Sequence, residues 1–253
     1  TGTLDTNGQS VTTSGTFSIT GTSTRTLTLG ASSITCATWT ATTTTNLTFN
    51  ANTSTIAITG ATTFNGGALT YNIVNLTGTT PTIAGVNTFG TLTRTGTAVK
   101  TDTLTLSANQ TITGTLTING NSAVNRMLVK SNTVGTARTL TAATVTVTNA
   151  DFQDITGAGT GSWDLSAITG LSGDCGGNSG ITFTTAATQT ANGTTSFSWS
   201  TASRWTSRVP LPQDNVVINN AFGTSQTVTI DMPRVGASVD FTGATWTTAL
   251  TLS

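Results

Sequence analysis

The chain has 253 residues, and only 7% of them are charged: nine are basic, nine are acidic and none is histidine. Without histidine, a Ser-His-Asp triad and a His-ligated zinc site are excluded. Two cysteines are too few for a cysteine-rich metal or disulfide scaffold. A net charge of zero argues against a nucleic-acid partner, because a phosphate backbone requires a basic surface. Apolar runs are short, so we expect no membrane insertion.

Threonine, with 68 residues, alternates with leucine, isoleucine or valine along much of the chain. The segments 24–29, 103–106, 111–118 and 144–148 show this pattern. A period of two places the apolar side chains on one face of a strand and the β-branched threonines on the other. Helical periodicity is almost absent, and glutamate, a good helix former, does not occur. The sequence therefore predicts an all-β protein.

A longer period is superimposed on this alternation. A set of strand centres can be placed at Leu27, Leu47, Leu69, Leu92, Leu116 and Leu140. Shorter apolar pairs such as Ile56/Ile58, Val74/Leu76 and Leu104/Leu106 lie between these centres. Two or three short strands in about 20–24 residues are typical of one coil of a β-solenoid. We therefore predict a β-solenoid, right-handed and parallel, with a β-sandwich as the alternative because it also has closely spaced short strands.

No charged residue lies between Arg25 and Arg94. A sandwich surface of that size would normally carry charges for solubility. Stacked threonine and asparagine side chains can instead bond to their counterparts in neighbouring coils. Neutral, threonine-rich sheets also associate readily, which favours a subunit of a fibre or trimer whose surfaces are covered by partners.

The composition changes near residue 150. Most of the acids, four of the five tryptophans and three of the four prolines follow that point. We therefore divide the chain into a threonine-rich solenoid over 1–150 and a less regular β region over 151–253, with a soft boundary at 150–160. We expect the second region to continue into further chain.

The clearest local motif runs from Trp199 to Trp205 and on through 209–218, where two prolines precede a buried strand. An exposed pair of tryptophans would stack on sugar rings. The alternative, which we favour, is a corner where both rings cover the end of a core, since the chain has few other large apolar side chains.

The stretch Trp199–Ile218 resembles repeats in Thr/Gly/Asn-rich β-helical proteins of phage tails, virion fibres and bacterial surface adhesins. Those repeats read Asn-Trp-Ser-x-x-x-x-Trp and then Val-Pro-x-x-x-Asp-x-Val-x-Ile, and here Ser198 replaces the first Asn. Segments 151–157, 173–180 and 231–236 are similar to sequences of the same kind. The resemblance covers roughly residues 150–245. It implies a structural or adhesive role and carries no catalytic residue to transfer.

Two features invite a chemical role. The glycine-rich loop 173–178 offers oxygen ligands for calcium from Asp174 and Asn178, although a turn bonded to the backbone is the simpler interpretation. Asp151, Asp154 and Asp164 form the densest acid cluster and would be the carboxylates of a polysaccharide-degrading, tailspike-like domain. We favour turn-capping for these acids, because no recognisable hydrolase or lyase pattern accompanies them.

Two further features leave alternatives open. Thr-x-Thr rows would bind ice if they occupied one position of every coil, but the spacing of the coils drifts. Cys36 and Cys175 lie 139 positions apart, so a disulfide would have to join distant coils. We expect two buried free thiols instead.

We predict a non-enzymatic structural and adhesive component of an extracellular, cell-surface or virion fibre. It would assemble with copies of itself and require no cofactor or metal, and a cell-surface glycan is a further candidate partner. An ice- or glycan-binding solenoid is the first alternative, and the tailspike-like domain is the second. No residue is assigned a catalytic role.

Overall fold

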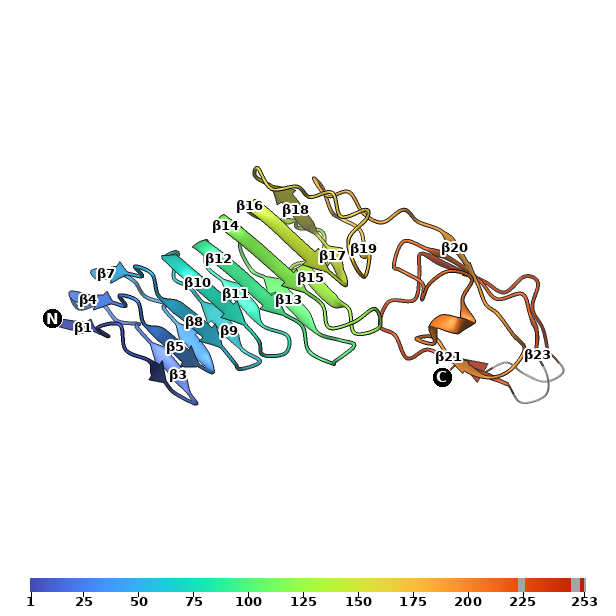
Figure 1. Cartoon of the computed structure of the whole chain (residues 1–253), viewed down its shortest axis with the longest axis horizontal. Helices are drawn as coiled ribbons and strands as arrows, with labels where there is room; N and C mark the ends of the chain where they lie inside the picture. The colour runs from blue at the N-terminus through green and yellow to red at the C-terminus, as the bar shows by residue number, and fades with distance from the viewer. Residues whose placement is uncertain (223–225, 247–250, 253) are drawn as a thin grey trace.

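The computed structural model describes residues 1–222, 226–246 and 251–252. Apart from one short 3-10 helix, η1 (Ala202–Arg204), the regular structure of these residues is β-strand. Neighbouring strands within every sheet run parallel, and they form two stacks (Figure 1). The all-β prediction is confirmed. In the described residues, no helix has the length and hydropathy needed to cross a membrane.

The long stack comprises residues 1–184 and three sheets, A, B and C. Sheet A holds β1 (Gly2–Asp5), β4 (Arg25–Thr28) and β7 (Leu47–Asn50). Sheet B holds, in spatial order, β2 (Val11–Thr12), β5 (Ser33–Cys36), β8 (Thr55–Ile58), β10 (Thr70–Leu76), β12 (Thr88–Thr95), β14 (Gln110–Asn119), β16 (Arg138–Thr148) and β18 (Ile155–Ala158). Sheet C holds β3 (Thr16–Ser18), β6 (Thr38–Thr40), β9 (Thr63–Asn65), β11 (Thr82–Ala84), β13 (Thr103–Leu106), β15 (Met127–Ser131), β17 (Ala150–Gln153) and β19 (Ser172–Asp174).

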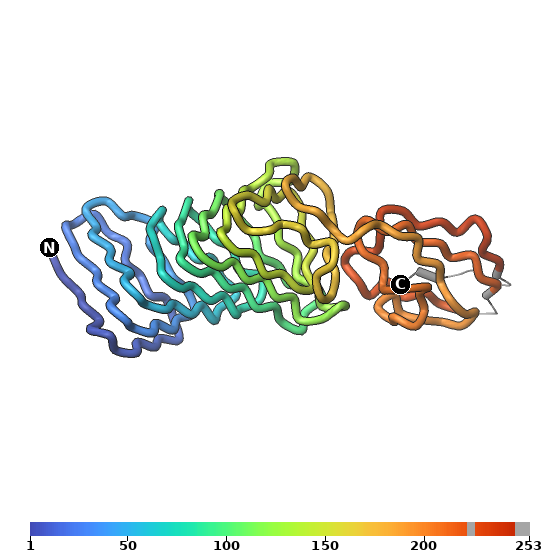
Figure 2. Tube along the Cα trace, turned by 45° about the horizontal axis from the view of Figure 1, so that its top comes forward, coloured from blue at the N-terminus to red at the C-terminus, as the bar shows by residue number. Residues whose placement is uncertain are grey.

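The short stack comprises the described residues 185–222, 226–246 and 251–252, and it lies beyond the β19 end of the long stack (Figure 2). One of its sheets holds β20 (Thr188–Thr190), β22 (Asn215–Val217) and β25 (Ser238–Asp240). A second holds β21 (Phe197–Ser198), β24 (Thr227–Thr229) and β27 (Thr251–Leu252), and the third holds β23 (Ala221–Phe222) and β26 (Thr245–Trp246). The second region is therefore built from parallel strands like the first.

In the long stack the chain visits the sheets in a repeated order, so that each circuit adds a strand beside the one before. Circuit length varies. Thr20 bonds Thr42 at a separation of 22 residues, Asn72 bonds Ser54 at 18, and Thr139 bonds Asn109 at 30. The loops absorb most of these differences, although the β12–β14 and β14–β16 ladders each contain a shift of register.

The inward side chains form the core of the long stack. Trp39 is fully buried in this core, with Phe17 stacked at 4.9 Å between ring centroids and Tyr71 edge-on at 5.9 Å. The leucine column predicted from spacing is largely wrong. Leu92 does pair with Leu116, but Leu27 lies beside Phe49, not Leu47. A fixed period cannot find the column because the loop lengths change from circuit to circuit.

The outward positions carry threonine as predicted. On sheet B, Thr93 pairs with Thr117 and Thr117 with Thr146, while Thr115 pairs with Thr144. Each of these residues follows the period-two pattern, and the inward neighbours Leu116 and Ile118 are fully buried.

Sheets A and B are separated by a corner only in the first three circuits. Asn7, Gly30 and Asn52 each occupy this corner with positive φ (50°, 57° and 47°). The left-handed conformation suits glycine and asparagine, and it turns the chain from sheet A into sheet B. From β10 onward the corner is missing, and one longer strand continues where two had been. This loss accounts for the shortening from 22 to 18 residues and leaves a step in the outer surface.

The change of composition near residue 150 does not coincide with a change of core. Sheets B and C continue to β18 and β19, and Trp163 and Leu165 still belong to the core of the long stack. Phe183 packs against that core, whereas Ala191 belongs to the core of the short stack. The cores therefore separate between those two residues.

Candidate functional site

The two ends of the long stack differ. At the β19 end, Trp163 and Leu165 are buried, and Phe183 packs on Phe152 at 6.0 Å between ring centroids. A Cβ on Gly157 would lie 2.6 Å from the Trp163 ring, so glycine is what lets the ring close over the last strands. This end is capped in the way that repeat proteins cap their terminal units.

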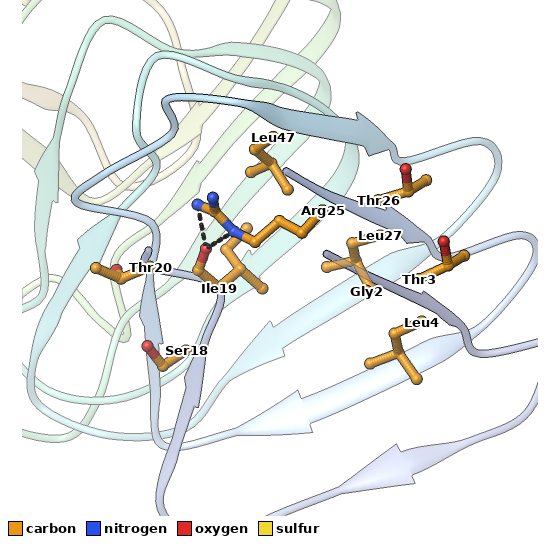
Figure 3. Close-up of a pocket in the computed structure, with 10 residues that line it drawn as sticks. All are labelled: Gly2, Thr3, Leu4, Ser18, Ile19, Thr20, Arg25, Thr26, Leu27 and Leu47. Carbon is orange, nitrogen blue, oxygen red and sulfur yellow. Dashed lines mark hydrogen bonds between the residues drawn. The ribbon is translucent and has the colours of Figure 1, made fainter. Parts of the chain in front are cut away.

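At the other end, β1, β2 and β3 are the outermost strands of their sheets. A pocket of about 300 Å³ opens there, between sheets A and C (Figure 3). Leu4, Ile19, Leu27 and Leu47 line it with apolar side chains, and Leu4 is 53% exposed. We define the open end as β1, β2, β3 and the residues that line this pocket, which belong to the first circuits of the described chain.

Arg25 spans the open end without an acidic partner among the described ion pairs (Figure 3). Its Nε and Nη2 donate to the carbonyl oxygen of Ile19 at 3.1 and 2.9 Å, and Nη2 also donates to Thr43 O at 2.6 Å. Nη1 donates to the carbonyl oxygens of Ser23 and Thr45, each at 3.0 Å. Because backbone carbonyls accept hydrogen bonds from its Nε, Nη1 and Nη2 atoms, Arg25 holds together the two loops that precede β4 and β7. It therefore has little hydrogen-bonding capacity left for a ligand.

The three acids of the predicted cluster have separate tasks. Asp151 is buried and accepts from Arg126 Nε at 2.7 Å and from Arg234 Nε at 2.6 Å. Asp154 is buried with φ 54° and accepts from the backbone N–H of Gly135 at 3.1 Å.

Asp164 is exposed and accepts from the hydroxyl and the backbone N–H of Ser166, bonds that lower the pKa of its carboxyl. In the described part of the chain, no group of three or more His, Cys, Asp or Glu side chains gathers to hold a metal. The carboxylates are therefore engaged in structural bonds.

The glycine-rich loop 173–178 is a turn bonded to itself and to its neighbours. Asp174 Oδ1 accepts from Gly176 N at 2.8 Å and from Asn178 Nδ2 at 2.7 Å. Asn178 also accepts from Ile155 N and donates to Phe152 O. Asp174 Oδ1 and Asn178 Oδ1 thus already accept hydrogen bonds from the protein, as the turn interpretation predicted.

Trp199 and Trp205 are core residues of the short stack. Their exposed fractions are 0% and 3%, and their ring centroids lie 4.8 Å apart. Trp205 Nε1 donates to the carbonyl oxygen of Trp199 at 2.7 Å. The favoured corner interpretation is confirmed, and an exposed pair for stacking on sugars is not present.

Cys36 and Cys175 are both free. Cys36 is fully buried as predicted, but Cys175 is only half-buried, at the junction of the two stacks. Burial raises the pKa of Cys36 to about 11, and burial together with the nearby Asp151 charge raises that of Cys175 to about 12. Neither thiol is set up as a nucleophile at neutral pH.

One buried ion pair, between Arg94 and Asp102, was not predicted from the sequence. Arg94 occupies an inward position of sheet B and is 0% exposed, and its Nη2 contacts Asp102 Oδ1 at 2.5 Å. Asp102 also accepts from the backbone N–H of Thr80 at 2.9 Å, and from the N–H and hydroxyl of Thr97 at 2.7 and 2.9 Å. Burial raises the pKa of the Asp102 carboxyl, but these N–H groups and the Arg94 charge outweigh it and hold the pKa below its usual value. In the sequence, the only indication of this pair is that Arg94 stands at a position where the alternation predicts an apolar residue.

Polar bonds join the two stacks. Lys100 pairs with Asp231 at 2.6 Å, and Arg234 pairs with Asp151 as described above. Gln213 receives a bond from Asp174 N and donates to the carbonyl oxygens of Ser172 and Thr184. A pocket of about 630 Å³ lies beside these contacts, lined by Cys175, Arg234 and neighbouring residues.

Comparison of the chain with protein-family models, with curated proteins and with solved structures finds no match. The functional argument therefore depends on the outer faces and the pockets of this chain alone.

Proposed function

We propose that this chain is a right-handed parallel β-solenoid that acts as a non-enzymatic structural and adhesive subunit of an extracellular, cell-surface or virion fibre and assembles with copies of itself. Parallel ladders and a repeated order of sheets support the solenoid, because a sandwich built from hairpins would pair its strands antiparallel. Right-handed winding follows from the strong preference of parallel crossover connections for that hand.

The observation that carries the proposal is the set of paired threonines on the outer face of sheet B. Thr93 pairs with Thr117 and Thr117 with Thr146, while Thr115 pairs with Thr144. A sheet face of uncharged, β-branched side chains can pack against the same face of a second copy, because no charge has to be removed from water. Contacts of this kind join copies side by side into a fibre.

The sides of the stack also support a fibre subunit. Residues 26–93 carry no charged side chain, so neighbouring copies would not repel each other along this surface. The outward hydroxyls of Thr20 and Thr42 bond each other between circuits at 3.0 Å. Such pairs satisfy polar groups on the surface without adding charge.

Self-assembly is tested by sedimentation velocity and negative-stain electron microscopy over a range of concentrations. We expect oligomers or filaments for the chain itself and a shift toward monomer for Thr146→Lys, which places a charge on the outer face of sheet B. Val134→Lys is the matched control, because Val134 is 82% exposed on a loop outside sheet B and should leave assembly unchanged. A monomer at every concentration, or equal assembly of both variants, would contradict the proposal.

Ice binding is a second candidate function, favoured by one observation. On sheet B, Thr115 and Thr117 lie in register with Thr144 and Thr146, and Thr93 extends one row to a third strand. The drift in circuit length therefore does not break the array here. An assay for inhibition of ice recrystallisation tests this function: Thr117→Lys should abolish any activity, and no activity of the chain itself at high concentration would exclude it.

A further inference from the structure

The step where sheets A and B merge forms a pocket of about 380 Å³ on the side of the long stack. It lies between β7, which still has the corner after it, and β10, which continues without one. β7 has no ladder to β10, so the outer surface is interrupted between these strands. Phe49 and Tyr71 line it with aromatic rings, and Asn52, Asn72 and three threonines line it with polar groups.

The base of this step pocket is aromatic. Phe49 is only half-buried, and its ring centroid lies 5.2 Å from that of Tyr71 and 6.3 Å from that of Trp39. Tyr71 is held in place because its hydroxyl accepts from Trp39 Nε1 at 3.0 Å and donates to Gly66 O at 2.7 Å. The Phe49 ring is thus a fixed apolar surface that remains partly accessible.

The rim of the step pocket is neutral and polar. Thr70, Thr88 and Thr113 contribute hydroxyls, and Asn52 and Asn72 contribute amides, groups that both donate and accept hydrogen bonds. Some of this capacity is already used: Asn52 Oδ1 accepts from Gly30 N, and Asn72 Nδ2 donates to Ser54 O. No lining residue is charged, and residues 26–93 carry no charge either.

We infer that the step pocket binds a neutral saccharide. An aromatic surface can pack against the C–H face of a sugar ring, while hydroxyls and amides around it match the sugar hydroxyls. The absence of charge disfavours anionic or cationic ligands, because nothing compensates the loss of their hydration. The volume lies in the range of about 300–1,000 Å³ that is usual for small-molecule sites. This inference deepens the adhesive part of the proposed function and rests on it.

The test is saturation-transfer-difference NMR with di- and trisaccharides of glucose, galactose, mannose and N-acetylglucosamine, beside sialylated and sulfated counterparts. At least one neutral sugar should bind. Thr70→Trp fills the pocket from an exposed position and should abolish binding, while Phe49→Leu should weaken it about tenfold. Thr146→Trp, an exposed threonine on sheet B outside the pocket, is the matched control and should bind as the unmodified chain does.

Failure of this inference is distinguishable from failure of the proposed function. No binding by any neutral sugar, binding of the anionic sugars alone, or undiminished binding by Thr70→Trp would overturn the inference. None of those results affects self-assembly, which is measured separately on the same samples by sedimentation velocity. Sugar binding by a chain that stays monomeric would uphold the inference and contradict the fibre.

Discussion

The buried ion pair of Arg94 and Asp102 gives the sharpest prediction about stability. Asp102 accepts four hydrogen bonds: one from Arg94, two from backbone N–H groups and one from a hydroxyl. Asp102→Asn leaves a single acceptor oxygen and turns an NH₂ group toward donors. It also leaves Arg94 buried without its counter-charge.

Breaking a buried pair by removing one partner costs about 3–5 kcal/mol. Loss of two charge-assisted bonds, at about 1.5–3 kcal/mol each, gives a similar figure. We therefore expect Asp102→Asn to lower the free energy of unfolding by about 3–5 kcal/mol, measured by urea unfolding followed with far-UV circular dichroism.

Arg94→Leu combined with Asp102→Asn should cost less than the sum of the two single changes, because Arg94 lies in the row of Leu76 and Ile118 and leucine restores that apolar row. A cost below about 1 kcal/mol for Asp102→Asn, or strict additivity in the double variant, would refute the argument.

The pair also sets a pH dependence. The pKa of Asp102 is lower in the folded chain than in the unfolded chain, so the unfolded state takes up protons first as the pH falls. The stability that Asp102 contributes is present above its unfolded pKa, about 3.9, and is lost as the pH falls through its folded pKa. We expect the urea midpoint to fall in acid below about pH 4, with a smaller fall for Asp102→Asn. Equal slopes for both proteins would contradict this assignment.

Three further predictions concern the short stack and the thiols. Trp199→Ala or Trp205→Ala should destabilise the short stack by about 3–5 kcal/mol, seen as a separate early unfolding transition, because both rings are buried. Arg234→Gln removes the ion pair that crosses between the stacks and should speed limited proteolysis at their junction without changing the circular dichroism spectrum. Cys36 and Cys175 should resist alkylation at pH 8, because burial raises the pKa of both thiols, and should react at once in denaturant. Normal stability of the tryptophan variants, unchanged cleavage, or rapid alkylation of the folded chain would each count against the corresponding argument.

The sequence predicts the strand content and the facing of side chains well. Alternation of threonine with Leu116 and Ile118 depends only on the pleat of a strand, and that is a local property. The pairing partners are harder to predict, because circuit length in the long stack ranges from 17 residues between Arg138 and Ile155 to 30 between Asn109 and Thr139. Only the fold shows that the loops absorb this variation.

The candidate sites also differ in how far the sequence predicts them. The burial of Trp199 and Trp205 could be predicted from composition, because a threonine-rich chain has few other large apolar side chains to form a core. The step pocket could not, because it arises where the corner between sheets A and B is lost from one circuit to the next. The Arg94 pair was equally hidden, because Asp102 lies beyond a loop, eight residues further along the same circuit, and not on the strand of Arg94.

The central claim is that the chain assembles with copies of itself through the neutral, threonine-rich outer face of sheet B. Cryo-electron microscopy of the assembled material tests it most directly. We expect the face that carries Thr117 and Thr146 to lie against a neighbouring copy. Particles that are all monomeric, or assemblies in which this face of sheet B stays free, would contradict the account.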